Sequence, residues 1–153
     1  MTEDDMDGMN ETGIVAGPQS GRPRRLRGLA GAGFIAALAA MAATTLAAAL
    51  AQAAGVDFEA PEGGESIPLS GIAVVTGFFS VVGIGIAVAL LRWSARPAER
   101  FVGTAVPLTV VSLVPPFLSG ASTATVTALL GLHLVAATVM IPALARSLRT
   151  RTD

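Results

Sequence analysis

Four long segments of this 153-residue chain contain no charged side chain, and the charged residues lie in the stretches between them. The uncharged segments are residues 29–54, 67–91, 101–118 and 124–145. Buried helices of a soluble bundle keep a polar face that recurs every three to four residues, and none of the four segments shows one. Because a helix needs about 20 apolar residues to cross a bilayer, the pattern predicts an all-α fold, an integral membrane four-helix bundle.

The composition supports lipid as the solvent of these segments. Hydrophobic residues make up 52% of the chain and charged residues 14%, and the mean hydropathy is +0.67. Soluble domains carry about 25% charged residues, so this chain has too few to cover a soluble fold. The net charge of −1 gives no reason to expect a nucleic-acid partner.

Arginine predicts the orientation, because every basic residue is an arginine and all lie on one side of a four-pass path. They precede the first segment, separate the second from the third, and follow the fourth. Cytoplasmic loops are enriched in arginine and lysine, so we expect a plasma membrane protein with both termini in the cytoplasm. These arginines are Arg22, Arg24, Arg25, Arg27, Arg92, Arg96, Arg100, Arg146, Arg149 and Arg151.

The chain divides into a membrane domain and two tails. Residues 1–24 are acidic, polar and turn-rich, which predicts a disordered tail. Residues 25–148 form the expected four-helix transmembrane domain, and 149–153 form a short basic tail. An alternative for the first segment is a cleaved signal peptide ending in ALAQAA. That segment is 26 residues long, whereas the apolar region of a signal is about 7–15 residues, so a membrane helix is favoured.

The two connections without arginine are expected on the outer side. Residues 55–66 hold four carboxylates, at Asp57, Glu59, Glu62 and Glu65. Their spacing matches no EF-hand loop, so a solvated acidic turn is favoured over a calcium site. Residues 119–123 predict a tight hairpin in which Gly120 supplies the turn.

Prolines interrupt the third segment, and small residues line the first two. In lipid, close packing of small residues holds helices together, and alanine and glycine are frequent in residues 29–54 and 67–91. Pro107 removes one backbone donor and is expected to bend its helix near the start, while Pro115–Pro116 should fray the outer end. The carbonyls that lose their donors need partners inside the protein.

His133, the only histidine, lies near the centre of residues 124–145 and therefore near the middle of the bilayer. A polar ring at that depth should face the bundle and find a partner. The candidate intramembrane polar site comprises His133, Ser112, Thr109 and Thr76, with Thr44, Thr45 and Ser80 as further candidate partners.

Each functional interpretation of His133 requires further residues that the four segments do not contain. A proton relay pairs histidine with an intramembrane carboxylate, bis-histidine haem needs a second histidine, and a metal needs more ligands. The favoured interpretation is a neutral ring that bonds a hydroxyl or carbonyl and fixes helix packing. No catalytic, cofactor-binding or metal-binding residue is predicted, and no cofactor.

Three motifs carry a resemblance to a known family. They are AAGVDF after the first segment, SLVPPFLSG at the end of the third, and LLGLHLVAATVMIPALAR around His133. With them, residues 25 to 148 resemble an actinobacterial family of small four-pass membrane proteins, domain of unknown function 6069. The resemblance implies a four-helix membrane fold and a shared His133, with no assigned activity. Pro115–Pro116 departs from the Gly-Pro of the family at this position.

The sequence therefore predicts only a class of function, without a substrate. With no Cys, Tyr or Lys, one His and no carboxylate in the four segments, a catalytic constellation cannot be assembled, and we expect no enzyme. The leading hypothesis is a non-enzymatic packing or partner subunit whose partners are the lipid bilayer and either another membrane protein or a second copy. The alternatives are a small transporter or channel, acting as a dimer, and a haem- or quinone-linked redox subunit using His133.

Overall fold

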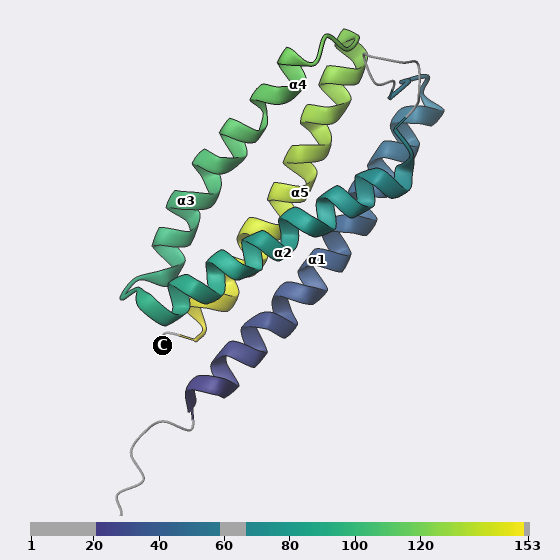
Figure 1. Cartoon of the computed structure of the whole chain (residues 1–153). Helices are drawn as coiled ribbons and strands as arrows, with labels where there is room; N and C mark the ends of the chain where they lie inside the picture. Colours follow the sequence, from purple (N-terminus) through teal and green to yellow (C-terminus); the bar gives the residue numbers. More distant parts are fainter. Residues whose placement is uncertain (1–20, 59–66, 152–153) are drawn as a thin grey trace, which may run out of the picture.

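A computed structural model describes residues 21–58 and 67–151 of the chain (Figure 1). Most of the predicted acidic tail, residues 1–20, lies outside the described residues. So do Asp153 of the basic tail and three carboxylates of the connection between the first two helices, Glu59, Glu62 and Glu65. Within the described ranges all regular structure is helical. The helices are α1 (Gly21–Ala53), α2 (Leu69–Trp93), α3 (Pro97–Ser112), α4 (Val114–Leu118) and α5 (Thr123–Arg149).

Four spans in the described residues are long and apolar enough to cross a membrane, which confirms the predicted all-helical fold with four apolar helices. They are Arg24–Ala53, Leu69–Trp93, Pro97–Leu118 and Thr123–Arg149. Large apolar side chains on their outer faces, such as Ile35, Phe78 and Val111, are exposed. Lipid tails would solvate such side chains, so their exposure fits a membrane protein.

Helix ends extend beyond the predicted apolar segments. α1 begins at Gly21 and α5 continues to Arg149, so both helices include arginines that had been assigned to flanking tails. Arginine has a high helix propensity, and proline is tolerated in the first turn, where Pro23 lies. Hydropathy therefore located the part of each helix that suits lipid but not the whole helix.

The third predicted helix is divided in two. α3 ends at Ser112, and after Leu113 the short α4 contains Pro115 and Pro116. The sequence predicted a frayed end here, whereas the structure has a separate helical turn. Gly120 has a φ of +69° in the α4–α5 connection, which confirms that glycine supplies this turn, because such a φ suits a residue without a Cβ.

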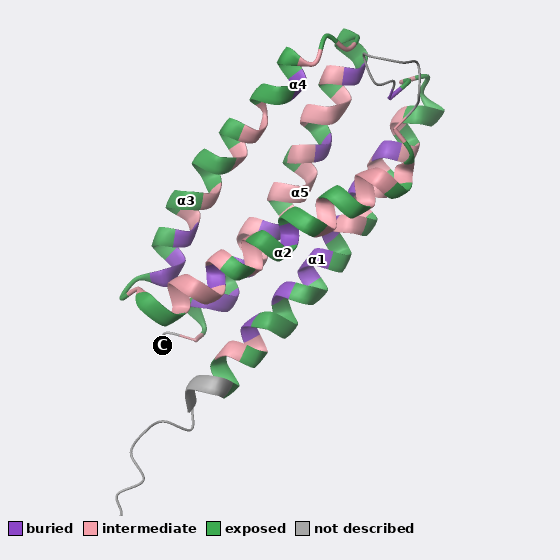
Figure 2. Cartoon of the chain, viewed as in Figure 1, coloured by how far each residue is buried: buried purple, intermediate pink, exposed green. Residues whose placement is uncertain are grey.

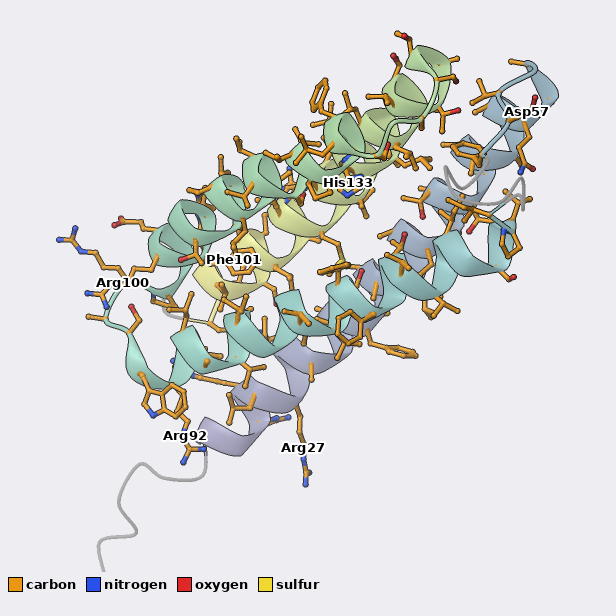
Figure 3. All side chains as sticks on the ribbon, turned by 45° about the horizontal axis from the view of Figure 1, so that its top comes forward. Arg27, Asp57, Arg92, Arg100, Phe101 and His133 are labelled. Carbon is orange, nitrogen blue, oxygen red and sulfur yellow. The ribbon has the colours of Figure 1, made fainter. Side chains whose placement is uncertain are left out.

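α1 packs against α2 and α5, which also contact each other, and α3 packs against α5 and α2, whereas the described backbones of α1 and α3 do not come close. Arg27, Arg92 and Arg100 lie at one end of the bundle and Asp57 at the other (Figure 3). We call these the arginine end and the Asp57 end.

The core consists of two separate clusters (Figure 2). The first, near the arginine end, takes buried residues from α1, α2, α3 and α5. The second, near the Asp57 end, is built around Ala48, Phe58 and Leu132 and contains no residue of α3 or α4. The buried residues of α3 are Pro97, Ala98 and Phe101, all in its first five positions. After Phe101, α3 packs the half-buried Val102 and Ala105 against the first cluster, and its residues beyond Ala105 belong to neither cluster. The first cluster comprises Leu29, Ala36, Ala37, Ala40, Ala87, Ala98, Phe101, Met140, Leu144, Ala145 and Leu148.

Candidate functional site

His133 lies in the middle of α5, roughly halfway between the two ends of the bundle (Figure 3). Met140 and Leu144 follow it by 7 and 11 positions and so share its side of the helix. Both of these residues are buried in the first core cluster. The imidazole is half-buried, so it lies at the border between the interior of the bundle and its surface.

The imidazole bonds its own helix. Nδ1 of His133 lies 2.8 Å from the carbonyl oxygen of Leu129, one turn earlier. A carbonyl only accepts, so Nδ1 must carry the proton in this bond, and in the neutral ring Nε2 is then an acceptor. No hydrogen bond joins Nε2 to any residue that the structure describes. The ring thus presents an available acceptor at mid-span.

The other predicted polar residues do not join His133 by hydrogen bonds. Thr109 Oγ1 donates to the Ala105 carbonyl at 2.8 Å, and Ser112 Oγ donates to the Thr109 carbonyl at 2.7 Å. Both hydroxyls therefore satisfy themselves within α3. Such bonds to a preceding turn are common for serine and threonine inside helices. The structure accordingly separates α3 hydroxyls from His133 in the hydrogen-bond network.

Thr76 makes an interhelical contact, but with Thr44 of α1. The two hydroxyl oxygens lie 3.2 Å apart, and Thr44 Oγ1 also lies 2.9 Å from the Ala40 carbonyl. Thr44 is 1% exposed. Hydroxyl pairs of this kind hold membrane helices at a fixed register, so the α1–α2 pair has one polar link in an apolar interface.

A second polar link, absent from the sequence analysis, joins the segment after α1 to the start of α5. Thr125 Oγ1 donates to the Asp57 carbonyl at 2.7 Å, and Ser122 caps α5 by accepting from the Thr125 N–H at 3.2 Å. Ser122 before an apolar helix was a readable N-cap signal. The partner on the other segment, 68 positions away, was not readable.

The structure describes only part of the acidic connection between α1 and α2. Asp57 is described, and the other three carboxylates of this connection lie outside the described residues. Across 21–58 and 67–151, no three His, Cys, Asp or Glu side chains gather in a group that could hold a metal ion.

Arginines meet at the other end of the molecule. Arg24 and Arg25 of α1 and Arg151, just past α5, line one open hollow together with Thr150. In the sequence, these arginines predicted orientation alone. Their meeting depends on α1 and α5 being neighbours, which charge patterning alone does not reveal.

Comparison with known protein families gives a match over most of the chain. A family model described as a family of unknown function, DUF6069, matches residues 24–150. No curated protein and no solved structure matches the chain. The matched region contains all four candidate membrane spans of the described residues.

Proposed function

The chain belongs to the DUF6069 family of unknown function, and from its structure we propose that it is a non-enzymatic, multi-pass protein of the plasma membrane that acts as a partner subunit. Its partner is a transmembrane helix of another membrane protein, docked on the outer side of α3 and α4. The family itself supplies no activity, so the proposal rests on the exposed backbone and side chains of this chain.

The docking surface is one stripe of α3 and α4, which we call the α3–α4 face. Its members recur at helical spacing, three, four and seven residues apart, so they lie on one side of the segment, and all are exposed. Val110 is 60% exposed and Val111 64%. Apolar exposure alone would suit lipid equally well. The face comprises Gly103, Pro107, Val110, Val111 and Val114.

Gly103 and Pro107 are the observation that carries the proposal. Proline has no N–H, so Pro107 cannot donate to the carbonyl of Gly103 one turn earlier. No side chain in the described residues donates to that carbonyl either. Both residues are exposed near the middle of the Pro97–Leu118 span. Unsatisfied backbone is tolerated at membrane depth only where protein or water covers it.

A partner helix would fit this position. A Cβ added at Gly103 would meet nothing within 4 Å, so a second helix has room to approach the backbone closely, as small residues allow in membranes. A hydroxyl or amide side chain on that helix would supply the missing donor. The adjacent valines would then pack against its apolar positions.

Photo-crosslinking tests the partner. A benzophenone amino acid at position 110 or 111 should capture one other membrane protein in intact cells, because these positions would lie in the interface. Matched probes at Phe34 and Phe79, which are equally exposed on α1 and α2, should capture none. Gly103→Leu should abolish the adduct and leave the monomer folded, because its side chain points into open space.

Three results would contradict this assignment. Equal capture from positions 34 and 79 would mean that the α3–α4 face is ordinary lipid-facing surface, and so would no capture at 110 and 111. An adduct with a second copy of the chain would replace the foreign partner with self-assembly.

The non-enzymatic part of the proposal is supported by what the chain offers for catalysis. It has no cysteine and no tyrosine, and its single histidine bonds its own helix. Enzyme sites combine a nucleophile or metal with an oriented base and a stabilising donor. His133 has no such companion among its hydrogen-bond partners.

Orientation is testable because the natural chain contains no cysteine. We expect Ala60→Cys to react with a membrane-impermeant maleimide in intact cells, and Ala95→Cys to react only after permeabilisation. The reason is that the arginines lie at the end where residue 95 connects α2 to α3, and arginine favours the cytoplasmic side. Labelling of both positions in intact cells would contradict the proposed topology.

A further inference from the structure

Three arginines from opposite ends of the chain line one hollow, which we call the arginine hollow. It has a volume of about 370 Å³ and is lined by Arg24, Arg25, Thr150 and Arg151. Arg24 and Arg25 lie in the first described turns of α1, and Arg151 follows the C-terminus of α5. The hollow is open to the surroundings of the arginine end, so a ligand would reach it without crossing the bundle.

Arg151 is held in place by contacts with both helices. Its Nε donates to Ser147 Oγ at 3.3 Å, and its backbone carbonyl accepts a hydrogen bond from Nη1 of Arg25. Its guanidinium lies over Gly28 of α1, where an added Cβ would fall 2.8 Å from Arg151 Cζ. Gly28 therefore leaves the space that this guanidinium occupies. A merely solvated arginine would not need these three features.

The charges at the arginine hollow are not balanced by any described carboxylate. Of the described carboxylates, Glu99 pairs with Arg96 at the α2–α3 connection, and Asp57 lies at the opposite end of the bundle. Like charges that converge repel one another, and an anion between them removes that cost. Guanidinium groups bind phosphate with paired, charge-assisted hydrogen bonds.

We propose that the arginine hollow binds a phosphate group, carried either by the headgroup of an anionic lipid or by soluble phosphate. The orientation bias of arginine explains why arginines gather at this end. It does not explain why Arg25 bonds the carbonyl of a residue 126 positions away, or why Gly28 makes room for Arg151. The site is independent of the α3–α4 face and goes beyond the partner role.

Native mass spectrometry of the full-length protein in a non-ionic detergent tests the site. Titration with phosphatidylglycerol should give a single tightly held adduct, and phosphatidylcholine should bind at least about tenfold more weakly. Arg24→Gln, Arg25→Gln and Arg151→Gln should each weaken phosphatidylglycerol binding about tenfold, because each removes a charge-assisted contact. Arg92→Gln and Arg100→Gln remove the same charge at the same end and should change it by less than about twofold.

Gly28→Ala distinguishes binding at a specific site from general electrostatic attraction to the arginines. It removes no charge and raises helix propensity, but its methyl group displaces the Arg151 guanidinium, so binding should weaken while the helical circular dichroism signal is kept. Unchanged binding in Gly28→Ala would overturn the proposal, and so would equal losses in the Arg92 and Arg100 variants.

A competition experiment identifies the source of the phosphate. If millimolar inorganic phosphate displaces phosphatidylglycerol from the wild-type protein, the arginine hollow is a site for soluble phosphate. If the lipid adduct persists, the headgroup of an anionic lipid is the ligand. Either result supports a phosphate site. Absence of binding by both probes would overturn it.

Discussion

Phe58→Ala is expected to lower the free energy of unfolding by about 3–5 kcal/mol, the range seen when a buried phenylalanine is truncated. Phe58 is 1% exposed and has the largest fully buried side chain among the described residues. With Ala48 and Leu132 it makes up the buried part of the second core cluster. The other helical members of the cluster come from α1, α2 and α5, and truncation of the ring would leave a cavity among them.

Thermal or SDS unfolding in detergent, followed by circular dichroism, measures this effect. Phe117→Ala is the matched control, because that ring is 66% exposed and its removal should change stability by less than about 1 kcal/mol. The segment around Phe58 is also anchored by the hydrogen bond from Ile67 N–H to the Phe58 carbonyl, 2.7 Å long. The substitution keeps that backbone bond, so a large loss of stability would be due to the missing ring. Equal losses for the two variants would show that Phe58 does not hold the Asp57 end together.

Gly33→Val is expected to destabilise the protein by about 1–3 kcal/mol through overpacking. A Cβ at Gly33 would lie 2.8 Å from Ile84 Cγ1 and 3.3 Å from Leu144 Cδ2. Three helices meet at this point, since Gly33 belongs to α1, Ile84 to α2 and Leu144 to α5. The added methyl groups would force α1 away from both neighbours.

Gly31→Val provides a closely matched comparison. It makes the same change on the same helix, two positions earlier, where a Cβ would meet nothing within 4 Å. Helix propensity changes equally in the two variants, so the difference between their unfolding free energies isolates the close approach at Gly33. If both variants lose the same stability, α1 does not pack against α2 and α5 through that glycine.

The four apolar helices were predictable because long uncharged segments have few alternatives to a membrane helix. Helix ends were less predictable, since Arg24 and Arg149 suit a helix whether or not lipid surrounds them. The break between α3 and α4 at Leu113 was partly predictable. Pro115 and Pro116 signalled an interruption, but the sequence did not show that the chain resumes helical geometry as α4.

Packing between helices was the part that the sequence could not provide. The small residues of α1 predicted close contacts, and Gly33 and Ala40 make them. Nothing in the pattern indicated that α3 would join the core only through its first turns. Its apolar residues look the same whether lipid or protein covers them.

The polar sites also had a predictable part and an unpredictable part. The mid-span position of His133 followed from counting residues, and a carbonyl was among its expected partners. The bond to Leu129 within the same helix was not foreseen, because a hydroxyl on another helix was an equally good partner on paper. The Thr44–Thr76 contact and the arginine hollow required knowing which helices are neighbours.

The attachment of α3 has a mechanical consequence. A rod held firmly at one end and loosely at the other bends like a cantilever, and the buried residues of α3, Pro97, Ala98 and Phe101, all lie at the arginine end. Sideways deflection of its far end would disturb no buried residue of the second core cluster, since α3 and α4 supply none. The resisting forces are then the contacts of α3 and α4 with α5, the buried Pro116 and the short hairpin at Gly120. The Asp57-end half of α3 is therefore the part of the bundle that buried apolar contacts restrain least.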